Sequence, residues 1–429
     1  MSSSLRISPI NHPLNATVRV PGSKSLTNRA LLIASLAKGK THITNALFSD
    51  DSKYFSKAVQ TLGFDIQLDE SNHEMTVTGL GGKIPVNKAE LFIGNAGTAA
   101  RFLSAFLTLG NGEYILDGEP RMRERPIGDL IHALRQLGVE LEAANNCPPV
   151  EIFARGLPGG KTKIAGNISS QFLSALLMVA PYAKSPIEIE LTTDLNSKPY
   201  VDMTIAVMQD FGVKIERDGY KSFVVHPDSY SLTPNYPIES DASAASYFFA
   251  APAVCGGTVR VENISRNSKQ GDIGFLDVLQ DMGCEVTEGE NFIEVTGTEL
   301  LNGMDVDMRD IPDTAQTLAV IAPFASSPTR IRGIASARVK ETDRVSATCT
   351  ELRRLGVQVE EYEDGMTIYP TFNLQPLTFK SASIQTYNDH RMAMAFSLIG
   401  LRFDGVTIEN PSCVSKTFPN FFEVLDSLH

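Results

Sequence analysis

The feature that most constrains this fold is an internal repeat. Five short strings resemble one another, and in each a glycine follows a segment of helical periodicity: TLGFDIQ, QLGVELE, DFGVKIE, DMGCEVTE and RLGVQVE. These glycines are spaced by 71 to 75 residues along the chain of 429. Glycine readily adopts the left-handed backbone that ends a helix, so each is predicted to be a helix C-cap. The alternating residues that follow predict a strand.

A second string, an apolar helix followed by a turn and a strand, repeats six times in the same rhythm. Its first and last copies are ALLIASLAKGKTHITNA and RMAMAFSLIGLRFDGVTIEN. The helices are apolar nearly all round, which predicts that they are buried. The sixth repeat stops at FFEVLDSLH, with its helix but without a strand after it. We expect the opening strand near LRISPI to supply the missing element.

Alternating helix and strand signals predict an α/β (α+β) fold of six repeats of about 72 residues each. A single hydrophobic core rarely serves more than about 250–300 residues, so we expect two lobes of three repeats. The simplest division places residues 1–21 and 241–429 in one lobe and residues 22–240 in the other.

Composition and charge exclude several classes of function. The formal net charge is −12, which argues against binding to nucleic acid or to an anionic membrane surface. The five cysteines have no metal-ligand spacing, and we expect buried thiols in a reducing compartment. No apolar run approaches 18 residues, and MSSSLRISPI lacks a signal-peptide core, so we expect a cytoplasmic protein. The string GLPGGKT fails the spacing of a phosphate-binding loop.

Polar residues gather at the first turns of the six buried helices: GSKSLTNR, GNAGTAAR, GNISSQF, SDASAAS, DIPDTAQ and YNDHRMA. Helix capping explains Asn95, Ser169, Asp241 and Asp310. It does not explain the cations Lys24, Arg29, Arg101 and Arg391, because the helix dipole is positive at this end. Several helix N-termini aimed at one cleft, with cations added, would bind anions. Further cations lie in RMRERP, RVKETDR and VSKTF, although a solvated face is the simpler explanation for RMRER taken alone.

Nine motifs, in order along almost the whole chain, resemble those of the 5-enolpyruvylshikimate-3-phosphate synthase family: PGSKSLTNRALL, GNAGTAAR, GEPRMRERPIG, SSQFLSALL, SKPYVDMT, RNSKQGD, RVKETDR, YNDHRMAM and KTFPNFF. The resemblance implies a two-lobed inside-out α/β barrel, with buried helices, sheets outside and the active site in the cleft between the lobes. It implies transfer of the enolpyruvyl group of phosphoenolpyruvate to the 5-hydroxyl of 3-phosphoshikimate, through a tetrahedral intermediate that releases phosphate. This is a reaction of the shikimate pathway, which leads to chorismate and the aromatic amino acids. The implied partners are these two substrates; no metal or organic cofactor is implied, and we expect a monomer.

The resemblance also implies roles for individual residues. Asp313 matches the family residue that takes the 5-hydroxyl proton, and Glu341 the residue implicated in proton transfer at C3, for which Lys24 is the alternative. The positions that resemble phosphoenolpyruvate contacts are Lys24, Gly97, Arg125, Gln171, Arg344, Arg391 and Lys416. Those that resemble 3-phosphoshikimate contacts are Lys24, Ser25, Arg29, Ser169, Ser170, Gln171, Ser197, Tyr200, Asp313, Ser336 and Lys340.

The chain departs from the family pattern at three positions. Ala100 and Phe102 stand where Met and Pro are common, next to the phosphoenolpyruvate site for which glyphosate competes in this family. Ser336 stands where many members have Asn, and a hydroxyl can replace only part of an amide's hydrogen bonding.

Three other functions fit the sequence less well. Enolpyruvyl transfer to a UDP-sugar usually comes with a Cys shortly before the Arg-Pro of a mobile loop, where this chain has Pro120. A non-catalytic anion-binding relative would lack the carboxylates of Asp313 and Glu341. RNA-end processing by a protein with similar repeats conflicts with the acidic charge.

Overall fold

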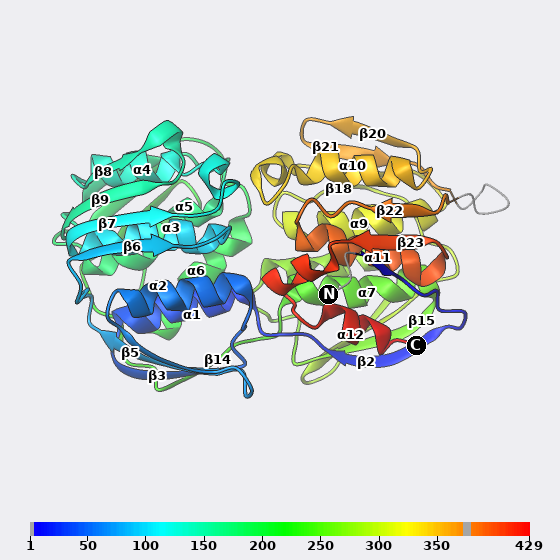
Figure 1. The fold of residues 1–429 in the computed structure, drawn as a ribbon, viewed down its shortest axis with the longest axis horizontal. Coiled ribbons are helices and arrows are strands. Elements are labelled where there is room, and N and C mark those ends of the chain that lie inside the picture. The colour runs from blue at the N-terminus through cyan, green and yellow to red at the C-terminus, as the bar shows by residue number, and fades with distance from the viewer. Residues whose placement is uncertain (1–3, 372–378) are drawn as a thin grey trace. The chain divides into compact units, whose positions relative to one another are not determined.

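The computed structural model describes residues 4–371 and 379–429 of the chain. It divides the chain into two compact units, shown in Figure 1. Unit 1 comprises Met1–Pro21 and Ser240–His429, and unit 2 comprises Gly22–Glu239. Ser240, which the sequence places in the other lobe, belongs to unit 1. There its hydroxyl lies 3.4 Å from the carbonyl oxygens of both Val20 and Glu262.

Within the described residues, each unit contains six α-helices. Those of unit 2 are α1 (Lys24–Leu36), α2 (Asp50–Thr61), α3 (Gly97–Phe106), α4 (Gly128–Gln136), α5 (Ser170–Val179) and α6 (Lys198–Asp210). Those of unit 1 are α7 (Ala242–Cys255), α8 (Phe275–Asp281), α9 (Ala315–Ile321), α10 (Arg344–Arg354), α11 (His390–Arg402) and α12 (Phe421–Asp426). The odd-numbered helices are those that the sequence predicts to be buried. The prediction is confirmed most fully in α3, α7 and α9, in which every residue is buried.

The strands of unit 2 form three sheets of one design. In order across each sheet they are β14 (Asn235–Pro237), β3 (Lys38–Thr44), β5 (Glu74–Leu80) and β4 (Asp65–Asp69); β6 (Lys88–Phe92), β7 (Asn111–Asp117), β9 (Val150–Arg155) and β8 (Glu140–Ala143); and β10 (Gly160–Ile164), β11 (Ile187–Leu191), β13 (Ser222–Val225) and β12 (Glu216–Asp218). In each sheet the first two strands are parallel, and the other pairings are antiparallel. The same pattern in three successive segments confirms the repeat.

Unit 1 has the same design, completed by the N-terminal segment. Its sheets are, in order, β16 (Glu285–Glu288), β17 (Phe292–Thr296), β15 (Gly257–Glu262) and β2 (Leu14–Arg19); β18 (Asp305–Asp307), β19 (Thr329–Arg332), β21 (Gly365–Ile368) and β20 (Val359–Tyr362); and β1 (Ser4–Arg6), β23 (Val406–Glu409) and β22 (Ala382–Ile384). Strand β1 pairs antiparallel with β23 of the sixth repeat. The opening strand therefore does supply the element that this repeat lacks.

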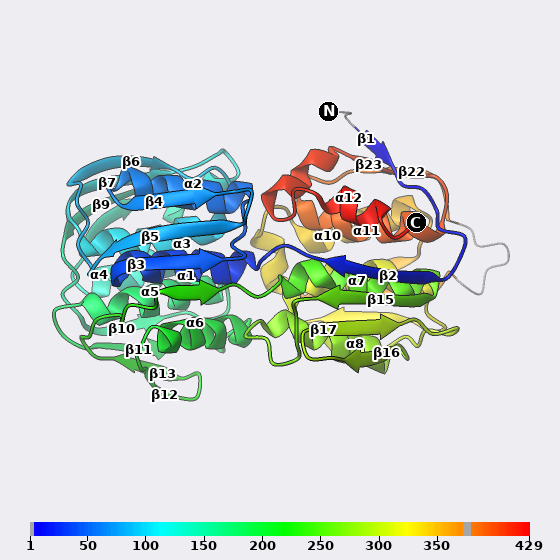
Figure 2. The ribbon, with the colours of Figure 1, turned by 90° about the horizontal axis from the view of Figure 1, so that it is seen from below.

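In each unit the sheets lie around the buried helices, whereas the even-numbered helices also reach the surface (Figures 1 and 2). In unit 2, α3 packs on α5, α5 on α6, and α1 on α2. Each unit has its own hydrophobic cluster. The strands of the described residues form separate sheets of three or four strands, so hydrogen bonds do not join them into one closed barrel.

Local signals explain how the repeats turn. The five repeated glycines all have φ between +82° and +103°, which confirms the predicted left-handed helix ends; they are Gly63, Gly138, Gly212, Gly283 and Gly356. Four of the five cysteines are buried free thiols, as the sequence predicts, whereas Cys147 is half-buried.

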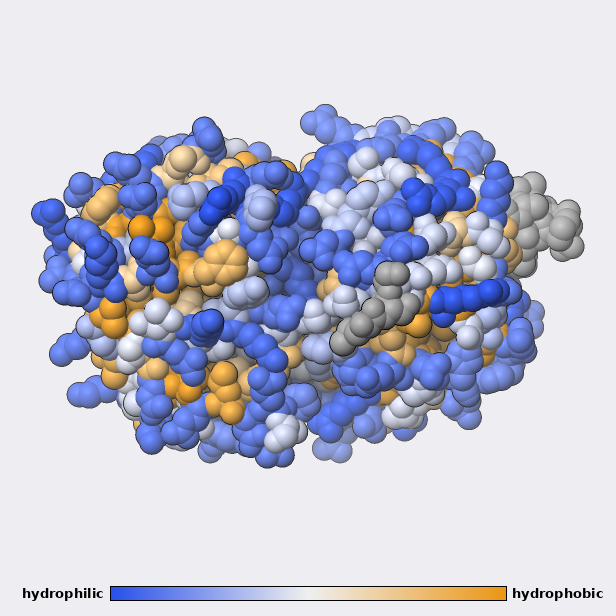
Figure 3. Space-filling view, in the orientation of Figure 1, coloured by the Kyte–Doolittle hydropathy of each residue, from blue (hydrophilic) through white to orange (hydrophobic). Residues whose placement is uncertain are grey.

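The outer sheet faces carry charged pairs. Across β10 and β11, Lys161 lies 2.8 Å from Glu188 and Lys163 lies 3.0 Å from Glu190, each between residues directly opposite in register. Figure 3 shows hydrophilic residues over much of the visible face of both units. Among the helices of the described ranges, none combines the length and apolar character needed to cross a lipid bilayer.

Candidate active site

The first predicted site residues of unit 2 lie at the start of α1. The hydroxyl of Ser23 caps this helix by accepting a hydrogen bond from the amide of Leu26 at 3.4 Å. Lys24 is the first helical residue, and its Nζ lies 3.6 Å from Oδ2 of Asp51, in the first turn of α2. A cation is unfavourable at a helix N-terminus, and the buried carboxylate of Asp51 offsets it. Ser25, the next residue, is half-buried.

Arg29 lies further along α1 and is only 1% exposed. Its guanidinium donates hydrogen bonds to four neutral oxygen atoms: Thr204 Oγ1 at 2.8 Å, the Ser25 carbonyl at 2.9 Å, the Tyr200 carbonyl at 3.1 Å and Ser174 Oγ at 3.5 Å. Burial lowers the pKa of Arg29 to about 10, so the guanidinium remains charged at neutral pH. A buried cation with neutral partners favours the approach of an anionic ligand group.

Two of the three departures from the family pattern lie in α3, and one of them, Phe102, contacts this arginine. The ring centroid of Phe102 is 5.3 Å from the guanidinium carbon of Arg29, a cation–π distance. Ala100 is fully buried one turn before Ser104, whose hydroxyl donates to its carbonyl at 2.7 Å. The aromatic ring at position 102 therefore helps to pack the buried guanidinium.

A second group of site residues surrounds the start of α3. The guanidinium of Arg125 donates to the backbone and side-chain oxygens of Asn95, at 2.9 and 3.0 Å. Arg101 donates to the carbonyls of Gly97 at 3.0 Å and Pro126 at 2.8 Å. Asn95 is therefore not the N-cap that the sequence predicts: the helix is capped at Ala96, and the Asn95 side chain accepts from Arg125 instead.

The resemblance implies that Gly97 and Arg125 contact phosphoenolpyruvate. On that basis we expect Gly97→Ala to weaken binding of this substrate without unfolding the protein. A Cβ at this position would lie 2.3 Å from a terminal nitrogen of Arg125 and 2.9 Å from one of Arg101. Both are ends of flexible side chains, so the fold can yield by displacing Arg125. Misplacing a binding group by about 1 Å can be costly, and we expect the KM for phosphoenolpyruvate to rise by about tenfold or more.

Steady-state kinetics with phosphoenolpyruvate as the varied substrate would measure this effect. The matched control is Gly274→Ala, where an added Cβ meets only the Ile311 side chain, at 3.9 Å. An unchanged KM in Gly97→Ala would contradict the assignment of Arg125 to this substrate.

The arginine-rich loop that carries Arg125 divides into two parts. Arg121 pairs with Glu124 at 2.9 Å and Arg123 with Asp117 at 2.5 Å, both on the surface. Arg125, which follows the short helix η2 (Met122–Glu124), is only 5% exposed. A solvated face therefore explains the first two arginines but not the third.

The remaining predicted residues of unit 2 lie at the starts of α5 and α6. Ser169 caps α5, as predicted, and accepts a hydrogen bond from the amide of Gln171 at 3.3 Å. The side-chain amide of Gln171 donates to Thr98 Oγ1 at 3.2 Å, which links the starts of α5 and α3. Ser170 is buried, and Ser197, also buried, precedes α6 with a left-handed backbone (φ +56°).

Unit 1 contributes a compact cluster of charges around Arg344, the first residue of α10. Its guanidinium, 3% exposed, bonds to three carboxylates: Asp389 at 2.8 and 3.3 Å, Glu341 at 2.8 Å and Asp313 at 3.1 Å. Burial alone would lower the pKa of Arg344, but the charges of Asp389, Glu341 and Asp313 outweigh it and raise that pKa above its ordinary value. The three carboxylates thereby hold the planar guanidinium group of Arg344 in one orientation.

Asp313 bridges two arginines of this cluster. It lies in η6 (Pro312–Thr314); Oδ1 accepts from Arg344 and Oδ2 accepts from Arg391 at 2.7 Å. The side chain is 18% exposed, so it is the most accessible of the three carboxylates around Arg344. Asp310 does not cap a helix, although the sequence predicts it to. The helical turn η6 begins at Pro312, and its N-cap residue is Ile311.

The other site residues of unit 1 lie close to this cluster in sequence or in space. Nζ of Lys416, the last residue of η9 (Pro411–Lys416), is 3.8 Å from Oε1 of Glu341. Lys340 is half-buried directly before Glu341, and Ser336 is buried in η8 (Ala335–Val339). The structure therefore brings together Asp313, Glu341, Arg344, Arg391 and Lys416.

Two carboxylates of the site were not identified from the sequence. Asp51 faces Lys24, and Asp389 both caps α11 and holds Arg344. The polar starts of α2 and α11 could have indicated them, since both lie at the N-terminus of a helix. They change the electrostatic picture, because Lys24 and Arg344 each face a buried acid. Arg29 and Arg101, in contrast, donate to neutral oxygen atoms.

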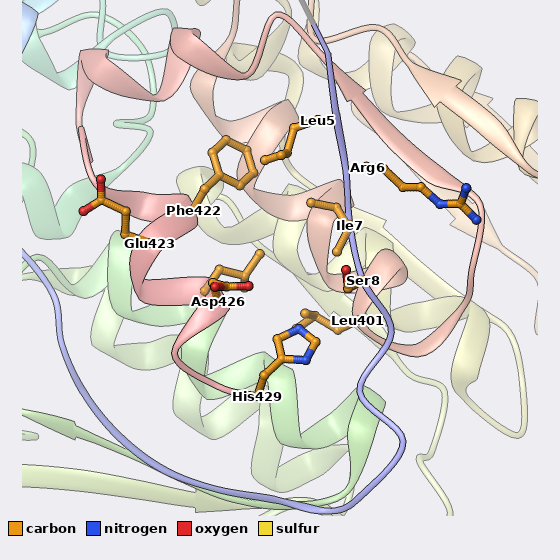
Figure 4. A pocket seen from close by; sticks show the side chains of 10 residues that line it. Leu5, Arg6, Ile7, Ser8, Leu401, Phe422, Glu423, Asp426 and His429 are labelled. Carbon is orange, nitrogen blue, oxygen red and sulfur yellow. The ribbon is translucent and has the colours of Figure 1, made fainter. Parts of the chain in front are cut away.

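Unit 1 also contains a separate cavity of about 330 Å³ between β1 and α12, shown in Figure 4. Its apolar wall includes Ile7, Leu401 and Phe422, and Glu423, Asp426 and His429 lie around it. It contains none of the predicted site residues.

The two units thus define an α/β protein built from repeats, in which buried helices begin with charged and hydrogen-bonding residues. A model of the family described as EPSP synthase (3-phosphoshikimate 1-carboxyvinyltransferase) matches residues 9–425. The chain belongs to this family.

Relatives and solved structures agree. The chain is 50% identical over 421 residues to a 3-phosphoshikimate 1-carboxyvinyltransferase of Trichormus variabilis, covering 98% of this chain and 97% of the relative. It is 48% identical over 429 residues to one of Marinomonas sp., covering 99% of each. Its structure is similar to that of EPSP synthase from Acinetobacter baumannii, with a TM-score of 0.82 at 26% identity, covering 99% of this chain and 97% of the other.

Proposed function

We propose that this chain transfers the enolpyruvyl group of phosphoenolpyruvate to the 5-hydroxyl of 3-phosphoshikimate and releases phosphate, by the residues described above. The single observation that carries the reaction is the match to one family across both units, with relatives 50% identical over 98% of the chain. The alternatives of a UDP-sugar acceptor and of a non-catalytic relative have no comparable support. The monomeric state and the cytoplasmic location stay predictions.

The anionic groups of the substrates explain the residue types. Each substrate carries a carboxylate and a phosphate, and a phosphate group contributes about −1.5 to −2 charges at neutral pH. We assign phosphoenolpyruvate to Lys24, Gly97, Arg125, Gln171, Arg344, Arg391 and Lys416. We assign 3-phosphoshikimate to Lys24, Ser25, Arg29, Ser169, Ser170, Gln171, Ser197, Tyr200, Asp313, Ser336 and Lys340. The contacts that support this are the buried guanidinium of Arg29 with neutral partners and the cation cluster of unit 1.

The base that takes the 5-hydroxyl proton is, in this proposal, Asp313. Its two oxygens accept hydrogen bonds from Arg344 and Arg391, which hold the carboxylate in one orientation. In this position the carboxylate can accept the proton as the hydroxyl oxygen attacks C2 of phosphoenolpyruvate. Its partial exposure distinguishes it from Asp389, which is completely buried and holds Arg344 instead.

The proton delivered to C3 comes from Glu341 or from Lys24. Glu341 lies between Arg344 and Lys416, at 2.8 and 3.8 Å. Substrate anions that pair with those two cations would compete with Glu341 for them and leave it free to carry a proton. Lys24, whose Nζ lies 3.6 Å from Asp51, remains the alternative donor.

Phosphate release from phosphoenolpyruvate, with and without 3-phosphoshikimate, tests the proposed function. We expect release to require both substrates, since the hydroxyl must add before phosphate can leave. Release that needs a UDP-sugar, or release that is independent of any acceptor, would contradict the proposal.

A further inference from the structure

The segment of residues 385–389, between β22 and α11, has an unusual backbone. Tyr387 and Asn388 are consecutive and both left-handed, with φ of +53° and +55°. Residues with a side chain rarely adopt this conformation, and such strain persists only where surrounding contacts hold it. The contacts of this segment therefore show what it is built to do.

The segment is attached to α10 at two places. At one end, the Tyr387 hydroxyl donates to Glu351 Oε1 at 2.8 Å, and the backbone amide of Gln385 donates to Oε2 at 3.1 Å. At the other end, Asp389 accepts from Arg344 at 2.8 Å. Glu351 is completely buried and lies about two helical turns after Arg344. The segment therefore runs along α10 and is anchored near both ends.

A third contact joins the segment to η9. Oδ1 of Asn388 accepts a hydrogen bond from the side-chain amide of Asn410, the residue before η9, at 3.2 Å. Lys416 ends η9, and Arg391 lies in the first turn of α11, two residues after the segment. One short segment thus contacts the elements that carry Arg344, Arg391 and Lys416, the three ligands assigned to phosphoenolpyruvate in this unit.

We propose that Tyr387 is a positioning residue for phosphoenolpyruvate: by its bond to Glu351 it holds residues 385–389 so that Asp389 keeps the Arg344 guanidinium in its binding orientation. The inference rests on the proposed function. Tyr387 itself is 42% exposed, so its ring contributes little to the core, and its hydroxyl is the part that reaches a buried partner.

The decisive variant is Tyr387→Phe, which removes one hydroxyl and leaves the ring. Loss of a hydrogen bond to a charged group changes an equilibrium constant by about tenfold or more. Because Asp389 keeps its other contacts, we expect the KM for phosphoenolpyruvate to rise about three- to tenfold. The KM for 3-phosphoshikimate should stay unchanged, and the thermal unfolding midpoint should fall by only about 2–8 °C, the shift expected from one lost hydrogen bond.

The matched control is Tyr369→Phe, which removes a surface hydrogen bond from a tyrosine to Glu360 at 2.9 Å in the same unit. This variant should leave both KM values unchanged. A second measurement places Tyr387→Phe in a Glu351→Met background. There the loss of the hydroxyl should have little further effect on the KM, because the two changes act through one contact.

The outcomes separate this inference from the proposed function. Absence of phosphate release in the wild type would overturn both. This inference alone would be overturned if the wild type is active and the KM of Tyr387→Phe for phosphoenolpyruvate lies within twofold of the wild-type value. An equal rise of the KM values for phosphoenolpyruvate and 3-phosphoshikimate in Tyr387→Phe would also overturn it. The same holds if Tyr387→Phe raises the KM for phosphoenolpyruvate as much in the Glu351→Met background as in the wild type.

Discussion

Arg344→Met is expected to abolish measurable phosphate release and to lower the free energy of unfolding by about 3–5 kcal/mol. The methionine side chain has a volume close to that of arginine, but it cannot donate hydrogen bonds to Asp389, Glu341 or Asp313. Asp389 is completely buried and Glu341 is nearly so, which leaves negative charge in the interior without its main counter-ion. Removing one partner of a buried ion pair is far more costly than removing the whole pair.

Urea unfolding and the phosphate-release assay would measure the two effects. The control is Arg332→Met in the same unit, which removes an exposed arginine from Asp305 and Asp307 and should change stability little. Arg344→Lys should keep part of the stability, because it restores the charge, but not the activity, because an ammonium group cannot reproduce the planar fork. A loss below about 1 kcal/mol in Arg344→Met would show that the carboxylates find other partners.

Asp313→Asn is expected to lower kcat by about a hundredfold to ten-thousandfold, the range typical of a lost general base. The amide keeps the shape of the carboxylate and one oxygen acceptor, but its NH2 group faces Arg344 or Arg391, which are donors themselves. The KM for phosphoenolpyruvate should therefore rise as well, by less than kcat falls. The amide cannot accept the 5-hydroxyl proton, so the addition step should slow selectively. The larger effect should therefore appear in kcat.

Asp310→Asn provides the comparison, since it makes the same change three residues earlier, at an exposed position. Both variants would be assayed for phosphate release at saturating concentrations of the two substrates. If kcat in Asp313→Asn stayed within tenfold of the wild type, another group would have to take the 5-hydroxyl proton, and Glu341 would be examined first.

Sequence reasoning succeeded wherever the signal was local. The repeated glycines end helices because few other residues tolerate their backbone, and the apolar helices are buried because no face of them is polar. Capping was predicted correctly at Ser169 and Asp241. It failed at Asn95, whose side chain accepts from an arginine 30 residues away, and at Asp310, where a short helical turn begins beyond it.

The amino-acid sequence by itself determined the six repeats, their α/β character and the family, because periodicity, turn residues and motifs depend on neighbours in the chain. Only the tertiary structure decided how charges are paired. Asp51 offsets Lys24, and Asp389 holds Arg344 from 45 residues away. The reason is physical: an ion pair depends on distance and burial, and packing of the helices sets both, whereas the order of residues along the chain does not.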